Sequence, residues 1–123
     1  MDILHFGPRD VPRWGQHASA ASLVVGATYF RVAYFDRDLH NPFMEPLIFI
    51  GRNLGEGDSG MFYFQTLESH MDGVRFGSPD HEAGDFHRVS EGTPFVYEYE
   101  RALDELLRCS RRRAEDEAAR NGS

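Results

Sequence analysis

Lysine is absent from this chain of 123 residues, and all 13 basic side chains are arginines. This excludes catalysis through a lysine Schiff base and the phosphate-binding lysine of a P-loop. Cysteine occurs once, as Cys109, so the chain cannot form an internal disulfide. The longest weakly polar run, 18–27, is far shorter than the roughly 18 residues that cross a membrane. The first ten residues lack the basic and apolar stretches of a signal peptide, so we expect a cytoplasmic protein.

Aromatic residues are plentiful: ten Phe, five Tyr and one Trp. The aromatic or apolar segments 28–35, 47–50 and 61–64 have the composition of β-strands. The connectors between them contain Asn, Pro, Gly and Asp, which favour turns. These features predict an antiparallel meander. Within 28–35 the alternation places the more apolar set toward the core, namely Thr28, Phe30, Val32 and Tyr34.

Weaker patterns predict further elements. In chain order these are an edge strand over 3–6, a short helix over 10–21, a helix over 66–72 that ends at Gly73, and short strands over 74–76 and 86–89.

The last third of the chain has the pattern of one long helix. Thr93 and Pro94 form a typical helix start, a hydroxyl cap followed by proline. An apolar stripe at helical spacing should cover one face of the sheet: Phe95, Tyr99, Ala102, Leu103 and Leu106. Charged residues lie opposite: Glu98, Arg101, Asp104, Glu105 and Arg108. The stripe stops after Cys109. We therefore expect a single α+β domain over 1–110, a small antiparallel sheet of three to five strands with the helix packed on one face, and a charged, frayed or disordered tail over 111–123.

Negative charge is concentrated in the middle of the chain. The whole protein carries a formal charge of −7, and residues 45–91 hold nine acids against three arginines, a balance of −6. Such a surface repels nucleic-acid phosphate and anionic membranes. It favours instead a partner protein with a basic surface, so we expect binding to neither nucleic acid nor membrane.

Two motifs resemble functional signatures but lie in the wrong context. Residues 55–60 spell G-x-G-x-x-G, yet another strand follows them where a dinucleotide site needs a helix. Residues 57–60 resemble the sequence around the nucleophilic serine of chymotrypsin-like proteases, but this chain is too short for their two β-barrels. A hairpin loop is the better interpretation of both.

Metal-ligating side chains gather only in the stretch 80–87, as His81, Glu82, Asp85 and His87. Their types suit zinc, but their spacing matches no known ligand pattern. The stretch 36–47 lacks the glycine and glutamate of a calcium loop. We therefore predict no metal and no cofactor.

Polar loops held by a sheet often carry binding residues. On this basis the candidate partner-binding residues are Asp36, Asp38, His40, Glu56 and Asp58. Phe43 and Met44 belong to the predicted loop 36–46, where they either add to the interface or, with better odds, turn into the core. Trp14 is either an interface anchor or packs the amino-terminal segment onto the domain.

No nucleophile–base pair, complete metal set or phosphate loop can be assembled from these residues. The sequence therefore favours a small acidic, non-catalytic protein that binds a partner protein, in an accessory or immunity-type role suggested by size and charge alone. The alternative is a small enzyme or ligand-binding domain with a pocket between sheet and helix that uses His and carboxylate side chains. The sequence leaves the oligomeric state open.

Overall fold

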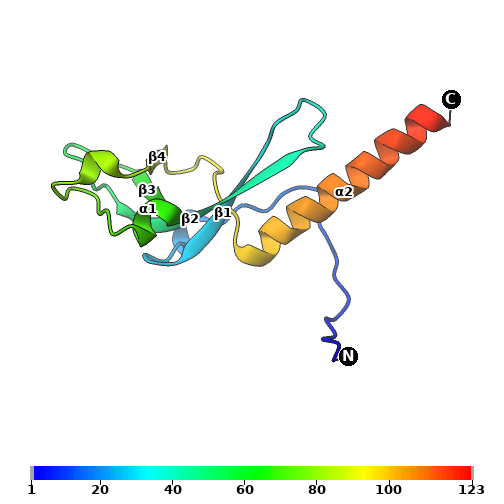
Figure 1. Ribbon diagram of the computed structural model, residues 1–123, viewed down its shortest axis with the longest axis horizontal. Coiled ribbons are helices and arrows are strands. Elements are labelled where there is room, and N and C mark those ends of the chain that lie inside the picture. The colour runs from blue at the N-terminus through cyan, green and yellow to red at the C-terminus, as the bar shows by residue number, and fades with distance from the viewer. Residues whose placement is uncertain (1, 123) are drawn as a thin grey trace.

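A computed structural model describes residues 2–122 of the chain. Four antiparallel strands form one sheet in the order β1-β2-β3-β4, and a long helix, α2, follows them (Figure 1). The bounds are β1 Thr28–Tyr34, β2 Pro42–Arg52, β3 Met61–Thr66, α1 Leu67–Met71, β4 Phe86–Ser90 and α2 Tyr99–Asn121, with 3-10 turns η1 Ala20–Ser22 and η2 His81–Ala83. The predicted α+β class, with a small antiparallel sheet and a long carboxy-terminal helix, is confirmed.

Strand β2 is longer than the sequence predicted. It begins at Pro42, so the predicted loop 36–46 is shorter, and Phe43 and Met44 are half-buried strand residues. The prolines in this half of β2 favour a loop in the sequence pattern. They are tolerated because β3 pairs with β2 only as far as Leu47, which leaves residues 42–46 bonded to β1 alone. The β1–β2 hairpin therefore extends beyond the rest of the sheet and lies alongside α2 (Figure 1).

The core lies on one face of the sheet. It contains seven buried residues: Leu23, Tyr29, Leu47, Phe49, Phe62, Phe64 and Val96. The predicted core-facing set of β1 was wrong, because Thr28 is exposed and Tyr29 is buried opposite Leu47. Alternation along the strand then places the whole predicted set on the other face. Phe30 and Tyr34 lie on the other face of β1, where each contacts α2.

Two irregular segments, 18–23 and 91–98, cover this core face. The Ala18 N–H donates to the Val96 carbonyl at 2.8 Å, which joins the two segments. Tyr97 and Phe30 exchange backbone hydrogen bonds of 2.8 and 2.9 Å, so the second segment ends as an extra bridge beside β1.

Several predicted elements near these covering segments were wrong. The strand over 3–6 and the helix over 10–21 do not form, and η1 is the one helical turn between residues 2 and 27. The helix start at Thr93 was also wrong, because the chain stays extended through Tyr97 and α2 begins after Glu98. Burial of Val96 and the bridge at Tyr97 outweigh the local helix signal of Pro94.

The opposite face of the sheet carries α1. The Thr66 side chain caps this helix by accepting a hydrogen bond from the Ser69 N–H at 3.3 Å, and the helix lies within the predicted range 66–72. Gln65 is fully buried beneath it and donates to Ser69 Oγ at 2.8 Å and to the Val74 carbonyl at 2.9 Å. The strand predicted over 86–89 is β4, whereas residues 74–76 form no strand.

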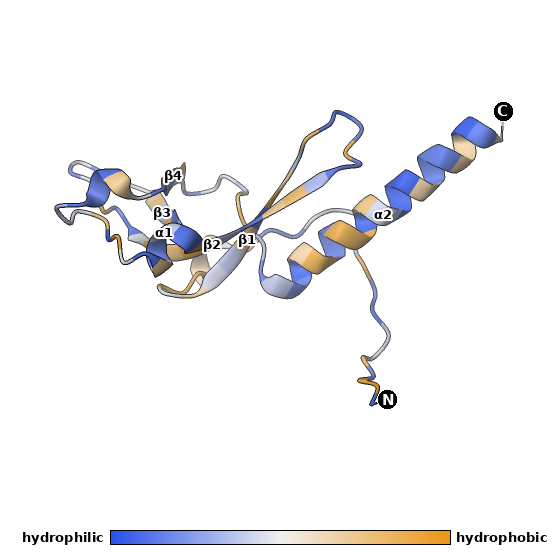
Figure 2. Cartoon of the chain, in the orientation of Figure 1, coloured by the Kyte–Doolittle hydropathy of each residue, from blue (hydrophilic) through white to orange (hydrophobic). Residues whose placement is uncertain are grey.

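Helix α2 is rotated from the predicted orientation. Ala102 of the predicted inward stripe is buried, but Tyr99 and Leu103 are exposed by 72% and 42%, and Asp104 from the predicted outer set is only 1% exposed. Figure 2 shows the apolar residues of α2 concentrated in its first half. The helix continues to Asn121, and Arg112 donates to the Leu39 carbonyl at 2.8 Å. A domain boundary at residue 110 stays a prediction.

Candidate functional site

The predicted partner-binding residue Asp36 is part of the hairpin turn. Its carboxylate accepts the backbone N–H groups of His40 at 3.1 Å and Asn41 at 2.8 Å. Desolvation opposes ionisation here, but these backbone hydrogen bonds prevail and hold the pKa of Asp36 below its usual value. Asp36 therefore shapes the loop that carries Asp38, whose own side chain is exposed.

His40 fastens the same loop to α2. Its Nε2 lies 2.7 Å from Asp116 Oδ2. Arg112 adds hydrogen bonds to the Leu39 carbonyl and to the Tyr34 hydroxyl. The hairpin tip is thus docked on the helix, and His40 faces its own chain.

Asp58 is enclosed by the β2–β3 loop. Its carboxylate accepts hydrogen bonds from Arg88 at 2.7 Å, from the Gly55 N–H at 3.0 Å and from the Tyr63 hydroxyl. The hydrogen bond from Arg88 is the main reason that the pKa of Asp58 lies below its usual value. Neighbouring Glu56 is exposed. The loop 53–60 joins two strands, so the hairpin interpretation of its glycine motif is confirmed.

The five predicted partner-binding residues therefore form no single site. Asp36, Asp38 and His40 lie on the hairpin beside α2, and Glu56 and Asp58 lie in the β2–β3 loop at the other end of the molecule (Figure 1).

The histidines of the stretch 80–87 diverge. His81 stacks on Phe86, with ring centroids 4.8 Å apart, and its Nδ1 accepts the Gly77 N–H. His87 lies on the core face of β4, where its Nε2 is 3.9 Å from an Asp85 oxygen. Among the described residues 2–122, no group of three or more His, Cys, Asp or Glu side chains is arranged to hold a metal.

A polar row that the sequence did not predict crosses the sheet at His87. Glu45 Oε1 lies 3.7 Å from His87 Nε2 and accepts a hydrogen bond of 3.1 Å from Arg31. Arg31 and Glu45 are direct cross-strand partners, so knowing that β2 begins at Pro42 would have revealed the pair. The row joins polar side chains of three strands, but within residues 2–122 no hydroxyl or thiol bonds to His87, so the row alone supports no covalent chemistry.

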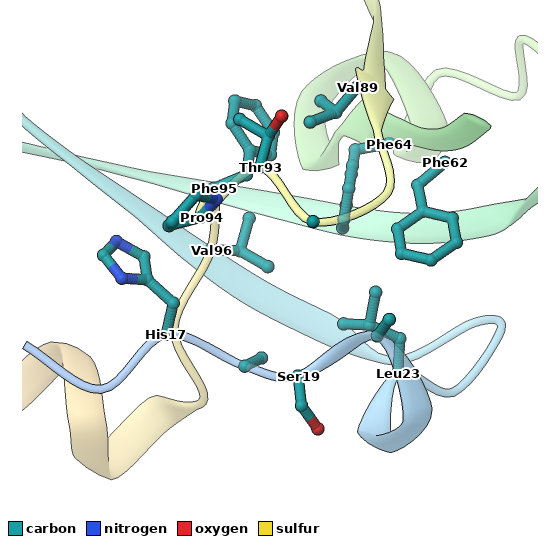
Figure 3. A pocket seen from close by; sticks show the side chains of 13 residues that line it. His17, Ser19, Leu23, Phe62, Phe64, Val89, Thr93, Pro94, Phe95 and Val96 are labelled. Carbon is teal, nitrogen blue, oxygen red and sulfur yellow. The ribbon is translucent and has the colours of Figure 1, made fainter. Parts of the chain in front are cut away.

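A cavity of about 340 Å³ opens between the core face and its covering segments. In Figure 3, Leu23 and Val96 approach Phe62 and Phe64 of β3 across it. The lining is His17, Ala18, Ser19, Ala20, Leu23, Phe62, Phe64, Val89, Gly92, Thr93, Pro94, Phe95 and Val96. It contains no Asp, Glu or Arg. Burial is the main cause that lowers the pKa of His17, so this imidazole is neutral at neutral pH.

This cavity differs from the pocket that the sequence led us to consider. It lies between the sheet and irregular segments, not between sheet and helix, and it contains none of His40, His70, His81 and His87. A second cavity, of about 930 Å³, lies between α2 and residues 9–14, and none of those four histidines lines it either.

Comparisons with protein-family models, with curated proteins and with solved structures gave no match. Within residues 2–122, no helix combines the length and apolar character needed to cross a bilayer. The functional argument therefore depends on the geometry and charge of this chain.

Proposed function

We propose that this is a non-catalytic protein that binds a partner protein through the acidic loops at the sheet end of the molecule. The partner presents a basic surface, and the role is of the accessory or immunity type. The observation that supports this is a set of exposed acids without an arginine partner among the described residues: Glu56, Glu68, Asp72, Asp80, Glu82 and Glu91. We name this set the acidic end.

The arginines nearest in sequence are engaged elsewhere. Arg88 is paired with Asp58. Arg52 donates to the Ala20 carbonyl and stacks on an aromatic ring of the core. Arg75 donates to the backbone of α1 and of its own turn. No arginine therefore pairs directly with the acids of this set, and the segment 45–91 keeps a net charge of −6. This balance favours approach of a basic partner and opposes approach of nucleic acid or anionic lipid.

The structure changes which predicted residues serve this proposal. Glu56 belongs to the acidic end, and Asp38 is exposed on the hairpin. Asp36, His40 and Asp58 are committed to internal hydrogen bonds, so their contribution is to hold the loops in shape.

Affinity capture from cells of the source organism tests the proposal. The wild-type protein should retain a specific partner at low salt and lose it as salt rises, because exposed charges are screened over about 8–10 Å near physiological ionic strength. The double variant Glu56→Arg/Glu82→Arg should retain less of it. The matched control is Asp2→Arg/Glu117→Arg, which reverses two exposed acids away from the acidic end. Equal capture by all three proteins, independent of salt, would refute the role of the acidic end.

A second candidate function, ligand binding, is favoured by the cavity in the core face. Its uncharged, largely apolar lining fits a small uncharged aromatic molecule better than a charged substrate. Indole is a suitable probe in an NMR titration. Saturable shifts should disappear in Ala18→Leu, which fills the cavity, and persist in Ala21→Leu, which changes a neighbouring exposed residue outside the lining. Shifts that are absent, or equal in both variants, would reject this candidate.

A further inference from the structure

An apolar stripe on α2 is largely exposed, although Tyr99 contacts Phe30 of β1. Tyr99, Leu103 and Leu107 are exposed by 72%, 42% and 43%. They are spaced four residues apart and therefore lie along one side of the helix, with half-buried Leu106 beside them. A helix of a monomeric protein normally directs such a stripe toward its own core.

Polar contacts on the other sides of α2 hold the helix in this orientation. Asp104 is bonded to Arg9 at 2.7 Å, and Glu105 accepts a 2.7 Å hydrogen bond from Tyr34. Rotating α2 to bury the stripe would break both contacts, which join the helix to the amino-terminal arm and to β1. The exposure of the stripe is therefore built into the fold.

The amino-terminal arm, residues 2–16, enlarges this surface. Arg108 donates to the Pro12 carbonyl at 2.9 Å and so fixes the arm along α2. Trp14 nevertheless remains 77% exposed, and with Leu107 it lines the groove of about 930 Å³ between arm and helix. Large aromatic residues that are exposed in this way are typical of protein interfaces.

We infer that the stripe binds the same stripe of a second copy of this chain, with the two α2 helices antiparallel about a two-fold axis. In this arrangement Leu103 of each copy lies opposite Leu107 of the other. A two-fold interface needs a surface that is complementary to itself, and the charges that flank the stripe meet this condition.

Glu100 and Arg111 supply the complementary charges. Glu100 precedes Leu103 by three residues and Arg111 follows Leu107 by four, on the same edge of the stripe. In the antiparallel pair, the levels of Glu100 of one copy and Arg111 of the other therefore differ by one residue, which is about 1.5 Å along the helix axis. Parallel two-fold pairing would leave Glu100 of one copy and Arg111 of the other about 16 Å apart along the helix axis, so these two charges could not meet. The Arg111–Glu115 pair that exists within one chain is strongly exposed, at 82% and 64%, so it competes weakly.

Sedimentation or light scattering of the full chain tests the inference. The wild-type protein should show twice the 14.0 kDa mass of one chain, and Leu103→Glu/Leu107→Glu should show the single mass. Because both leucines are well exposed, this variant should keep the wild-type circular dichroism spectrum. Leu54→Glu is the matched control, since Leu54 is 39% exposed in the β2–β3 loop and should leave the dimer intact.

A charge swap then tests the antiparallel register. Glu100→Arg alone and Arg111→Glu alone should each weaken dimerisation by roughly fivefold, and the double variant should restore it. A wild-type protein of single-chain mass at every concentration overturns the inference. A dimer that the leucine substitutions leave intact also overturns it. Neither outcome depends on the acidic end, because the partner of the acidic end is tested separately by affinity capture.

Discussion

Asp104 gives the sharpest test of how this fold is held together. Its carboxylate is 1% exposed and accepts hydrogen bonds from Arg9 at 2.7 Å and from Arg101 at 3.0 Å. Each charge-assisted hydrogen bond contributes about 1.5–3 kcal/mol when buried. The two arginines are 32% and 44% exposed, so water compensates part of the loss. We expect Asp104→Asn to lower the free energy of unfolding by about 2 kcal/mol, which corresponds to a midpoint about 8 °C lower.

The effect should depend on pH in a defined direction. Burial would raise the pKa of Asp104, but the hydrogen bonds from Arg9 and Arg101 outweigh it and hold the pKa below its usual value. A carboxyl group with a lowered pKa in the folded state stabilises the protein above its unfolded pKa of about 3.9, and this contribution is lost as the pH falls through the folded pKa. The difference between wild type and Asp104→Asn should therefore be full at pH 7 and shrink below about pH 4.

Urea unfolding of a double-mutant cycle with Arg9→Met provides the assay. If the contact is real, the cost of Asp104→Asn should be smaller in the Arg9→Met background by about 1 kcal/mol. Asp72→Asn is the control, because this exposed acid has no arginine partner among the described residues. An Asp104→Asn cost below about 0.5 kcal/mol, or equal costs in both backgrounds, would refute the reasoning.

Three further outcomes are expected. Burial and a hydrogen bond to Glu105 raise the pKa of Tyr34 to about 12. The protonated Tyr34 hydroxyl therefore stabilises the fold fully below about pH 10, and this contribution is lost as the pH rises toward 12. In an ultraviolet titration of the tyrosines, the component that ionises at the highest pH should be absent from Tyr34→Phe. Gly84→Ala should destabilise the fold by about 1–3 kcal/mol in urea unfolding, because a Cβ there would overlap the Phe86 ring and lie 2.8 Å from Val74 Cγ1. An unchanged midpoint would contradict this packing. Truncation after Glu117 should leave the thermal midpoint unchanged. Truncation after Ser110 should lower the midpoint by several degrees, because it removes the hydrogen bonds between α2 and the β1–β2 loop. Equal midpoints of the two truncated proteins would show that these bonds do not stabilise the domain.

Much of the sheet could be predicted because local chemistry and tertiary structure agree there. The aromatic segment 61–64 forms most of β3, and α1 lies within the range 66–72 that the sequence predicted to end at Gly73. The alternation within β1 failed at Tyr29, because an irregular segment that precedes the strand covers this residue. No local pattern contains that information.

Helix α2 shows the limit of periodicity. The spacing of Tyr99, Leu103 and Leu106 identified a helix correctly, but apolar periodicity does not say which surface covers the stripe. Arg9, far away in sequence, selects the orientation by pairing with Asp104. The start of the helix was missed for a similar reason, since the bridge between Tyr97 and Phe30 is a long-range contact.

The candidate binding residues were chosen by type and loop position, which cannot separate a free carboxylate from a bonded one. Asp58 illustrates this, because its partner Arg88 lies on β4 and reaches it only in the folded sheet. Glu56, two residues earlier, is exposed, yet nothing in the local sequence distinguishes the two.

The covering segments 18–23 and 91–98 have a consequence for the order of folding. They are distant in sequence, and a backbone bond from Ala18 to Val96 joins them, while the two bonds between Tyr97 and Phe30 join the second segment to β1. Contacts of this range close late, because loop-closure entropy must be overcome first. Once formed, the cover can also open by itself, so the amides of Ala18 and Tyr97 should exchange with deuterium faster than those of β2 and β3. A small molecule would then reach the cavity in the core face when the covering segments open locally, while the sheet stays folded.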